Sequence, residues 1–356
     1  MLDAWGDGNV AALAGAFGGI LLGLAARLGR FCTLGAIEDH AYGGSDIRLR
    51  MWVLAIGTSV LGTYACFAFG WANPTSTFYL SQGFAPIATV LGSLLFGYGM
   101  AMAGNCGYGA LARLGGGDLR SFVIVVVMGL AAYATLSGPG AWLRVTLFPP
   151  QGAVAEPQGI AFFVNSFTGL PIWSIGVAIG LLMIVLALAS SAMRADRRAI
   201  IWSVIVGLSV ISAWVFTSWI AANGFDGTPV VSHTFAAPLG ETMLYAMTST
   251  GQTLSFGIGS VAGVWLGAFS GSLIKGHFRW EACEDPRELR RQIFGAAMMG
   301  VGAAVALGCS IGQGLSAFSL LAFSAPLAFA SMYIGARLGL KHLIEGFAPD
   351  ISWRNS

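Results

Sequence analysis

Two glycine-rich stretches of this chain match each other although they lie far apart. Residues 97–109 read GYGMAMAGNCGYG, and residues 300–312 read GVGAAVALGCSIG. At an offset of 203 residues, both stretches keep the first and last glycine, two alanines and one cysteine, which is Cys106 in the first and Cys309 in the second. A weaker third copy contains Cys32, at an offset of 74 residues from Cys106. The repeat predicts a fold assembled from related units.

The composition indicates a helical membrane protein. Of 356 residues, 56% are hydrophobic and 10% are charged, whereas soluble domains carry about 25% charged residues. Continuous apolar runs of about 20 residues favour helices over a barrel, whose strands alternate in polarity. We therefore expect an all-α polytopic membrane protein embedded in a lipid bilayer. The sequence lacks the basic runs of nucleic-acid-binding proteins, and we expect no nucleic acid partner.

Apolar runs and their glycine and proline boundaries predict nine membrane spans. A shorter apolar piece near residues 240–252 is expected to form a half-helix, and the whole chain, residues 1–356, is expected to form one domain. The predicted spans are 10–29, 51–71, 86–105, 121–138, 172–193, 200–221, 255–274, 293–308 and 318–338.

The basic residues predict the orientation of these spans. With the N-terminus outside, 17 of the 18 Lys and Arg residues fall in inside loops or the inside C-terminus, and Arg144 alone is outside. The third and eighth spans then run in opposite directions, so the cysteine stretches enter the membrane from opposite faces. This is the inverted-repeat pattern of secondary transporters. We expect two halves, about residues 10–171 and 172–340, although small residues also serve close helix packing.

The three repeated cysteines are candidate binding residues for a soft anion. Each follows an apolar run and precedes a glycine-bearing turn: Cys32 in FCTLG, Cys106 in NCGYG and Cys309 in GCSIG. A thiol is a weak donor, and glycine lets backbone N–H groups approach an anion. A helix that starts after such a turn would point its positive end at the site. Cysteine is also a common buried residue, which is our interpretation of Cys66.

Further candidates flank these cysteines. Asn105 precedes Cys106, and its amide is expected to donate to a substrate oxygen; Gln313 is expected to do the same in the second half. Gly107 and Ser310 follow Cys106 and Cys309, and Arg113 lies at the inside end of a cysteine segment, where an arginine attracts anions or merely anchors the loop. We interpret His233 and Glu241 as solvated loop residues, and Cys283 as a solvated thiol in a charged inside loop.

Enzyme and metal signatures are absent from the sequence. No G-x-S-x-G elbow, P-loop or H-E-x-x-H motif occurs. The cysteines form no CxxC pair and the four histidines lie in unmatched places, so we expect no metal and no cofactor.

With these motifs, the chain resembles the YeeE/YedE sulphur transport family. The resemblance rests on residues 96–109, 113–123, 307–314 and 30–37, and it extends over about residues 10–340. It implies a nine-span fold with pseudo-two-fold halves and an hourglass-shaped interior. It also implies thiosulfate import across the bacterial inner membrane, with the N-terminus periplasmic and the C-terminus cytoplasmic. Cys32, Cys106 and Cys309 would pass thiosulfate along by S–H···S hydrogen bonds, and a cytosolic TusA-like sulfur carrier would receive it.

Two alternatives stay open at the level of the sequence. The cargo is either thiosulfate or another small sulfur or selenium species, since no pocket residue discriminates between them. A membrane thiol sulfurtransferase is the second alternative, and it would require a reactive thiolate. No feature of the sequence predicts the energy coupling or the oligomeric state.

Overall fold

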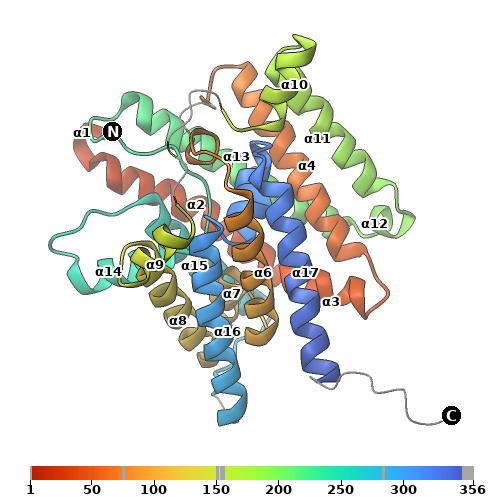
Figure 1. Cartoon of the computed structure of the whole chain (residues 1–356), viewed down its shortest axis with the longest axis vertical. Coiled ribbons are helices and arrows are strands. Elements are labelled where there is room, and N and C mark those ends of the chain that lie inside the picture. Colours follow the sequence, from red (N-terminus) through yellow and green to blue (C-terminus); the bar gives the residue numbers. More distant parts are fainter. Residues whose placement is uncertain (1, 74–76, 150–151, 153–156, 283–284, 347–356) are drawn as a thin grey trace.

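The computed structural model describes residues 2–73, 77–149, 152, 157–282 and 285–346. Within these residues, long helices pack side by side in one bundle, with α10 (Ile160–Thr168) at the top of the view and an end of α16 at the bottom (Figure 1). No β-strand longer than an isolated bridge occurs in the described part of the chain. The all-helical fold expected from the composition is confirmed.

Each of the nine predicted ranges overlaps one long helix of the described structure. Between these helices lie the shorter ones: α1 (Leu2–Trp5), α3 (Thr33–Ala41), α5 (Phe78–Ser81), α7 (Gly107–Leu114), α9 (Gly140–Leu147), α10, α12 (Ser191–Ala195) and α14 (Ala237–Thr248). The long helices are α2 (Asp7–Leu28), α4 (Ile47–Ala68), α6 (Pro86–Ala103), α8 (Leu119–Leu136), α11 (Ile172–Leu188), α13 (Arg197–Asn223), α15 (Phe256–Ile274), α16 (Pro286–Val305) and α17 (Ser324–Glu345).

Six helical stretches in the described part of the chain are long and apolar enough to cross a membrane. The helix α11 is apolar but shorter, and α16 and α17 do not reach the same apolarity. The chain is therefore a polytopic membrane protein by the length and composition of its helices. The six stretches are Asp7–Ala41, Ile47–Ala68, Pro86–Leu114, Leu119–Leu136, Arg197–Asn223 and Phe256–Ile274.

The last two long helices differ from their predicted ranges. Helix α16 begins at Pro286, seven residues before the predicted span, because the Asp285 carboxylate accepts a hydrogen bond from Arg287 N and caps a polar first turn. Helix α17 begins at Ser324, six residues after the predicted start. A π-helical turn, Gly312–Ala317, comes before it, and Leu321 then adopts a positive φ of 52° that ends the helical path. Apolarity alone did not reveal either boundary.

Close glycine contacts fix the relative directions of the helices. A Cβ added at Gly92 would lie 2.8 Å from Gly302 O, and one added at Gly99 would lie 2.6 Å from Gly295 O. As the number rises along α6, the number of its neighbour on α16 falls, so these two helices are antiparallel. They are the helices that precede Cys106 and Cys309.

Other glycines show the opposite relation. Added Cβ atoms at Gly15, Gly19 and Gly23 would lie within 2.4 Å of carbonyl oxygens of Phe256, Ser260 and Val264, respectively. The two series rise together in steps of four, so α2 and α15 are parallel, with their backbones in near contact. The two pairs agree with the predicted directions. The spans that correspond to α2 and α15 were predicted to cross the membrane in the same direction, and those that correspond to α6 and α16 in opposite directions.

Basic residues from distant segments gather at one end of the bundle. Arg27 Nε donates to Ser272 Oγ at 2.7 Å, and Lys275 Nζ donates to Arg27 O at 2.8 Å. The Arg198 guanidinium donates to Leu28 O, and Arg120 forms ion pairs with Glu281 and Glu288 at 3.8 and 3.7 Å. These contacts connect loops that the sequence analysis placed on the same side.

The contact between α6 and α16 yields a stability prediction. In Gly302→Ala, the new Cβ would lie 2.6 Å from Gly92 O and Phe96 N, and such overpacking costs about 1–3 kcal/mol. We expect a lower apparent melting temperature in detergent. The matched control is Gly251→Ala, whose nearest neighbouring atom would be 3.9 Å away. An unchanged melting temperature in Gly302→Ala would contradict the close approach.

Candidate functional site

The three repeated cysteines occupy the same local structure. Each follows the end of a long helix, α2, α6 or α16, and stands directly before a short helical segment: α3, α7 or residues 310–319. In all three copies, the residue two positions before the cysteine is in the left-handed region, where it ends the long helix. These residues are Arg30, Gly104 and Leu307, with φ angles of 57°, 78° and 55°. The repeat seen in the sequence is thus a repeat of backbone conformation.

The cysteine thiols cap the short helices. Cys106 Sγ accepts a hydrogen bond from Gly109 N at 3.4 Å, and Cys309 Sγ accepts one from Gly312 N at 3.5 Å. In the third copy, the Gly35 backbone interacts with the Cys32 thiol, although the geometry falls short of a capping hydrogen bond. The positive ends of the short helices therefore point at the sulfur atoms, as the glycine-bearing turns predicted.

The fold brings the three cysteines together in a row. Cys106 interacts electrostatically with both Cys32 and Cys309, and we call this succession of neighbours, from Cys309 through Cys106 to Cys32, the cysteine row. Cys106 and Cys309 are each 1% exposed, and Cys32 is partly exposed. All three are free thiols, as is the buried Cys66 of α4. Cys283 lies outside the described residues.

Hydroxyl and amide groups line the gaps between the thiols. Thr33 Oγ1 lies 3.9 Å from Cys106 Sγ, and the Ser310 hydroxyl lies beside the same sulfur without an aligned hydrogen bond. The Asn105 carbonyl oxygen is also buried, and within the described residues neither it nor the Ser310 hydroxyl has a hydrogen-bond partner. Unpartnered buried polar atoms are costly. The Ser310 hydroxyl can donate to an anion, whereas the Asn105 side-chain oxygen can only accept a hydrogen bond.

Two segments contribute contacts that the sequence analysis missed. From the loop before α14, Thr234 Oγ1 lies 3.7 Å from Cys309 Sγ, and Phe235 N donates to the same sulfur at 3.2 Å. Tyr79 of α5 hydrogen-bonds Thr234 and interacts electrostatically with Cys309. Neither Thr234 nor Tyr79 belongs to a repeated motif. Thr33, by contrast, follows Cys32 as Ser310 follows Cys309, and this correspondence was visible in the sequence.

Gln313, the predicted amide donor of the second half, is already engaged by the protein. Its Nε2 donates to Ala306 O at 2.8 Å and to Leu307 O at 3.3 Å, while its Oε1 accepts from Ser324 Oγ at 3.0 Å. These bonds join the end of α16 to the start of α17. Gln313 also lines a cavity of about 300 Å³ together with Arg144, the basic residue predicted to lie alone on the outside.

Gly107 and Arg113 lie at the two ends of α7. A Cβ at Gly107 would lie 2.7 Å from Met128 Sδ and 3.0 Å from Phe235 O, so glycine is needed there for close packing. Arg113 is exposed at the other end of the helix and interacts electrostatically with Cys32, Glu38 and Arg27. The structure thus places Arg113 at the basic end of the bundle and away from Cys309.

A cavity of about 820 Å³, lined by both polar and apolar side chains, lies next to the Cys309 side of the row. Thr234 lines it, together with Asp7, Ser232 and Glu241. A smaller cavity of about 180 Å³ shares Thr234 with it and also contains Tyr79 and Gly308. The row of cysteines therefore extends between the larger cavity next to Cys309 and the basic end next to Cys32.

Our interpretation of His233 and Glu241 as solvated loop residues is wrong. His233 is fully buried, and its Nδ1 pairs with Ser260 Oγ at 2.6 Å. Glu241 lies within α14 and is only partly exposed. His233 was misjudged because the tertiary partners of this polar loop cannot be read from the sequence: residues 231–233 bond to α13 and α15 instead of extending into solvent. Glu241 was misjudged because it belongs to α14 and lines a cavity.

Comparison with known proteins then identifies the family. A family model described as sulphur transport matches residues 28–338. The chain belongs to the sulphur transport family. Two members with curated names are the thiosulfate transporters TsuA of Escherichia coli and Spirochaeta thermophila. The first is 24% identical over 91% of this chain and 92% of its own length, and the second is 25% identical over 89% and 94%, respectively.

The cavity beside Cys309 yields a pH prediction. Burial raises the pKa of the Glu241 carboxyl, and a hydrogen bond from Ser255 partly opposes this shift. Above about pH 4.3, the usual glutamate pKa, the folded state holds the proton more strongly than the unfolded state. The Glu241 contribution to the free energy of unfolding therefore falls as pH rises, until the raised pKa is passed. We expect a flatter dependence of the apparent melting temperature on pH in Glu241→Gln.

The control for this measurement is Glu345→Gln, which removes an exposed carboxylate paired with Lys341. It is expected to retain the wild-type pH profile. A Glu241→Gln profile parallel to that of the wild type would show that Glu241 titrates as it would in water.

Proposed function

We propose that this member of the sulphur transport family imports thiosulfate across the bacterial inner membrane. The observation that carries the proposal is the row of thiols, from Cys309 through Cys106 to Cys32, between the cavity beside Cys309 and the basic end of the bundle. The two curated relatives are both named thiosulfate transporters and match nearly the whole chain. Thiosulfate enters at the Cys309 side and leaves beside Arg113.

The proposed topology has nine membrane spans in two inverted halves, about residues 10–171 and 172–340. Its support is the antiparallel packing of α6 against α16 and the parallel packing of α2 against α15. The basic end of the bundle faces the cytoplasm, in keeping with the positive-inside rule. The N-terminus is then periplasmic and the C-terminus cytoplasmic, and the cysteines lie in the waist of an hourglass-shaped interior.

Thiosulfate is a dianion with one exposed, soft sulfur, and its transfer through a dry interior requires many weak donors. The three S–H groups donate to that sulfur in turn, without forming a covalent bond. The hydroxyls of Thr33, Ser310 and Thr234 and the Asn105 amide solvate the oxygens. The positive ends of the short helices offset the charge, since an unpaired buried charge is prohibitive in free energy.

The flanking residues have supporting roles in this proposal. Gly107 admits the close approach of α7 to α8, and Gln313 holds the Cys309 turn by binding the end of α16. Arg113 attracts the anion at the cytoplasmic mouth. Inward movement of a dianion opposes the membrane potential by about 2.3 kcal/mol per charge per 100 mV. A cytosolic TusA-like sulfur carrier that consumes the product would pull uptake forward.

Loss of single thiols tests the row directly. In a strain without other sulfur importers, Cys106→Ala and Cys309→Ala are expected to reduce labelled thiosulfate uptake at least tenfold, because each leaves a gap in the donors. Cys66→Ala, which alters a buried thiol of α4 far from the repeated turns in sequence, is the matched control and is expected to keep wild-type uptake. Wild-type uptake by Cys106→Ala at equal expression would refute the thiol row.

Two further measurements separate the proposal from its alternatives. Unlabelled selenite, sulfite and sulfate are expected to compete with labelled thiosulfate less well than thiosulfate itself, and stronger inhibition by selenite would change the assigned cargo. Mass spectrometry of the protein after incubation with thiosulfate is expected to find unmodified cysteines. A stable persulfide on Cys106 or Cys309 would instead indicate a sulfurtransferase.

A further inference from the structure

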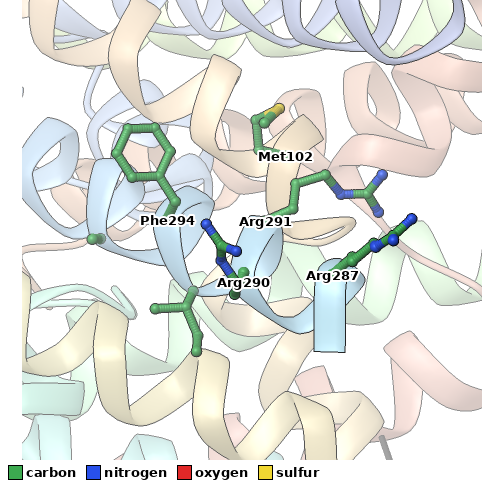
Figure 2. A pocket seen from close by; sticks show the side chains of 7 residues that line it. Met102, Arg287, Arg290, Arg291 and Phe294 are labelled. Carbon is green, nitrogen blue, oxygen red and sulfur yellow. The ribbon is translucent and has the colours of Figure 1, made fainter. Parts of the chain in front are cut away.

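A basic and apolar pocket lies on α16 and α6, on the outside of the bundle near the basic end. Figure 2 shows Arg287 and Arg291 extending to the same side of α16, with Arg290 between them and the ring of Phe294. The pocket has a volume of about 630 Å³. It is lined by Met102 of α6 and by Arg287, Arg290, Arg291, Ile293, Phe294 and Ala297 of α16.

The three guanidinium groups lack anionic partners within the described residues. No ion pair connects Arg287, Arg290 or Arg291 to a carboxylate there, because the neighbouring Glu288 pairs with Arg120 instead. Arg291 Nε is buried and has no hydrogen-bond partner in that part of the chain. The first turns of a helix also disfavour cations, since the helix dipole is positive at that end. Three arginines without anionic partners therefore make the electrostatic potential at the start of α16 positive, which favours the binding of an anion.

The apolar part of the pocket begins one turn farther along the helix. Phe294 follows Arg290 by four residues and Ala297 follows it by seven, so the three share one face of α16. The side chain of Phe294 is 60% exposed. Along this face, a guanidinium group is followed by an aromatic ring and then by a small apolar side chain. The distance from Arg290 to Ala297 along the helix axis is about 10 Å, at 1.5 Å per residue.

We propose that this pocket binds one anionic phospholipid, with the phosphate at the three arginines and an acyl chain along Phe294 and Ala297. The order of charged and apolar residues along the helix matches the order of headgroup and chain in a lipid. A soluble anion would contact only the charged part of the pocket. An acidic protein surface would not reach the residues that lie deeper along the helix. Basic pockets beside transmembrane helices are suited to such headgroups. This site does not depend on the cargo.

Native mass spectrometry of the purified full-length protein tests the proposal. With the wild type, phosphatidylglycerol is expected to bind at least tenfold more tightly than phosphatidylcholine of the same chain length. The variant Arg287→Gln/Arg290→Gln/Arg291→Gln is expected to lose this preference. The matched control is Arg197→Gln/Arg337→Gln/Lys341→Gln, which removes three exposed basic groups elsewhere in the predicted inside segments and is expected to keep it.

Two competition measurements on the wild type need no variant. Inorganic phosphate or thiosulfate at millimolar concentration is expected to leave bound phosphatidylglycerol in place, and displacement would identify a site for soluble anions. Phosphatidylglycerol with very short chains is expected to bind more weakly than the long-chain lipid, and Phe294→Ala is expected to reduce that difference. Equal binding of phosphatidylglycerol and phosphatidylcholine to the wild type would overturn the proposal.

Discussion

A helix that stops inside a membrane exposes backbone N–H and C=O groups where no lipid can satisfy them. The described part of this chain contains three helix interruptions, each formed by a left-handed residue and a cysteine, and the proposed topology puts them within the membrane. The cysteine sulfur accepts the first free N–H groups of the short helix that follows, at Gly109 and Gly312. The atom that satisfies the interrupted backbone is thus the same atom that faces the site. The backbone structure of these turns and the proposed transport function therefore both depend on a cysteine directly before each short helix.

The interruptions can lie side by side because the surrounding helices approach closely. Glycines at 92, 99, 295 and 302 bring the backbones of α6 and α16 into near contact, and a second series joins α2 to α15. In lipid, such contacts replace the hydrophobic driving force that is weak between membrane helices. A larger side chain at any of these positions would separate the helices and with them the thiols. The contact glycines of these helices thus contribute to the geometry of the site as well as to packing.

Charge is scarce in this chain but is highly organised. Arg27, Arg120, Arg198 and Lys275 meet at one end of the bundle through hydrogen bonds and ion pairs. The centre of the cysteine row carries no ionised side chain among its described neighbours, which are hydroxyls, amides and aromatic groups. An anion in this row would therefore be bound by thiol, hydroxyl and backbone dipoles and not by a formal opposite charge. In the proposed topology, the basic groups lie at the cytoplasmic end, where they anchor the protein to the membrane surface and attract the anion through the row.

The sequence by itself determined the all-helical membrane class and the three cysteine turns, because apolar length and glycine spacing are local properties that repeat along the chain. Six of the nine predicted spans overlap helical stretches that are long and apolar enough to cross a membrane in the described residues. The sequence also predicted that Cys32, Cys106 and Cys309 act together. It did not reveal Thr234 or Tyr79, which reach Cys309 from irregular segments without a motif, or the burial of His233. The sequence analysis predicted that the Gln313 amide donates to the substrate, although this amide donates to the carbonyl oxygens of Ala306 and Leu307. Only the tertiary structure decided these points, because hydrogen-bond partners and burial depend on which distant segments the helix packing brings together.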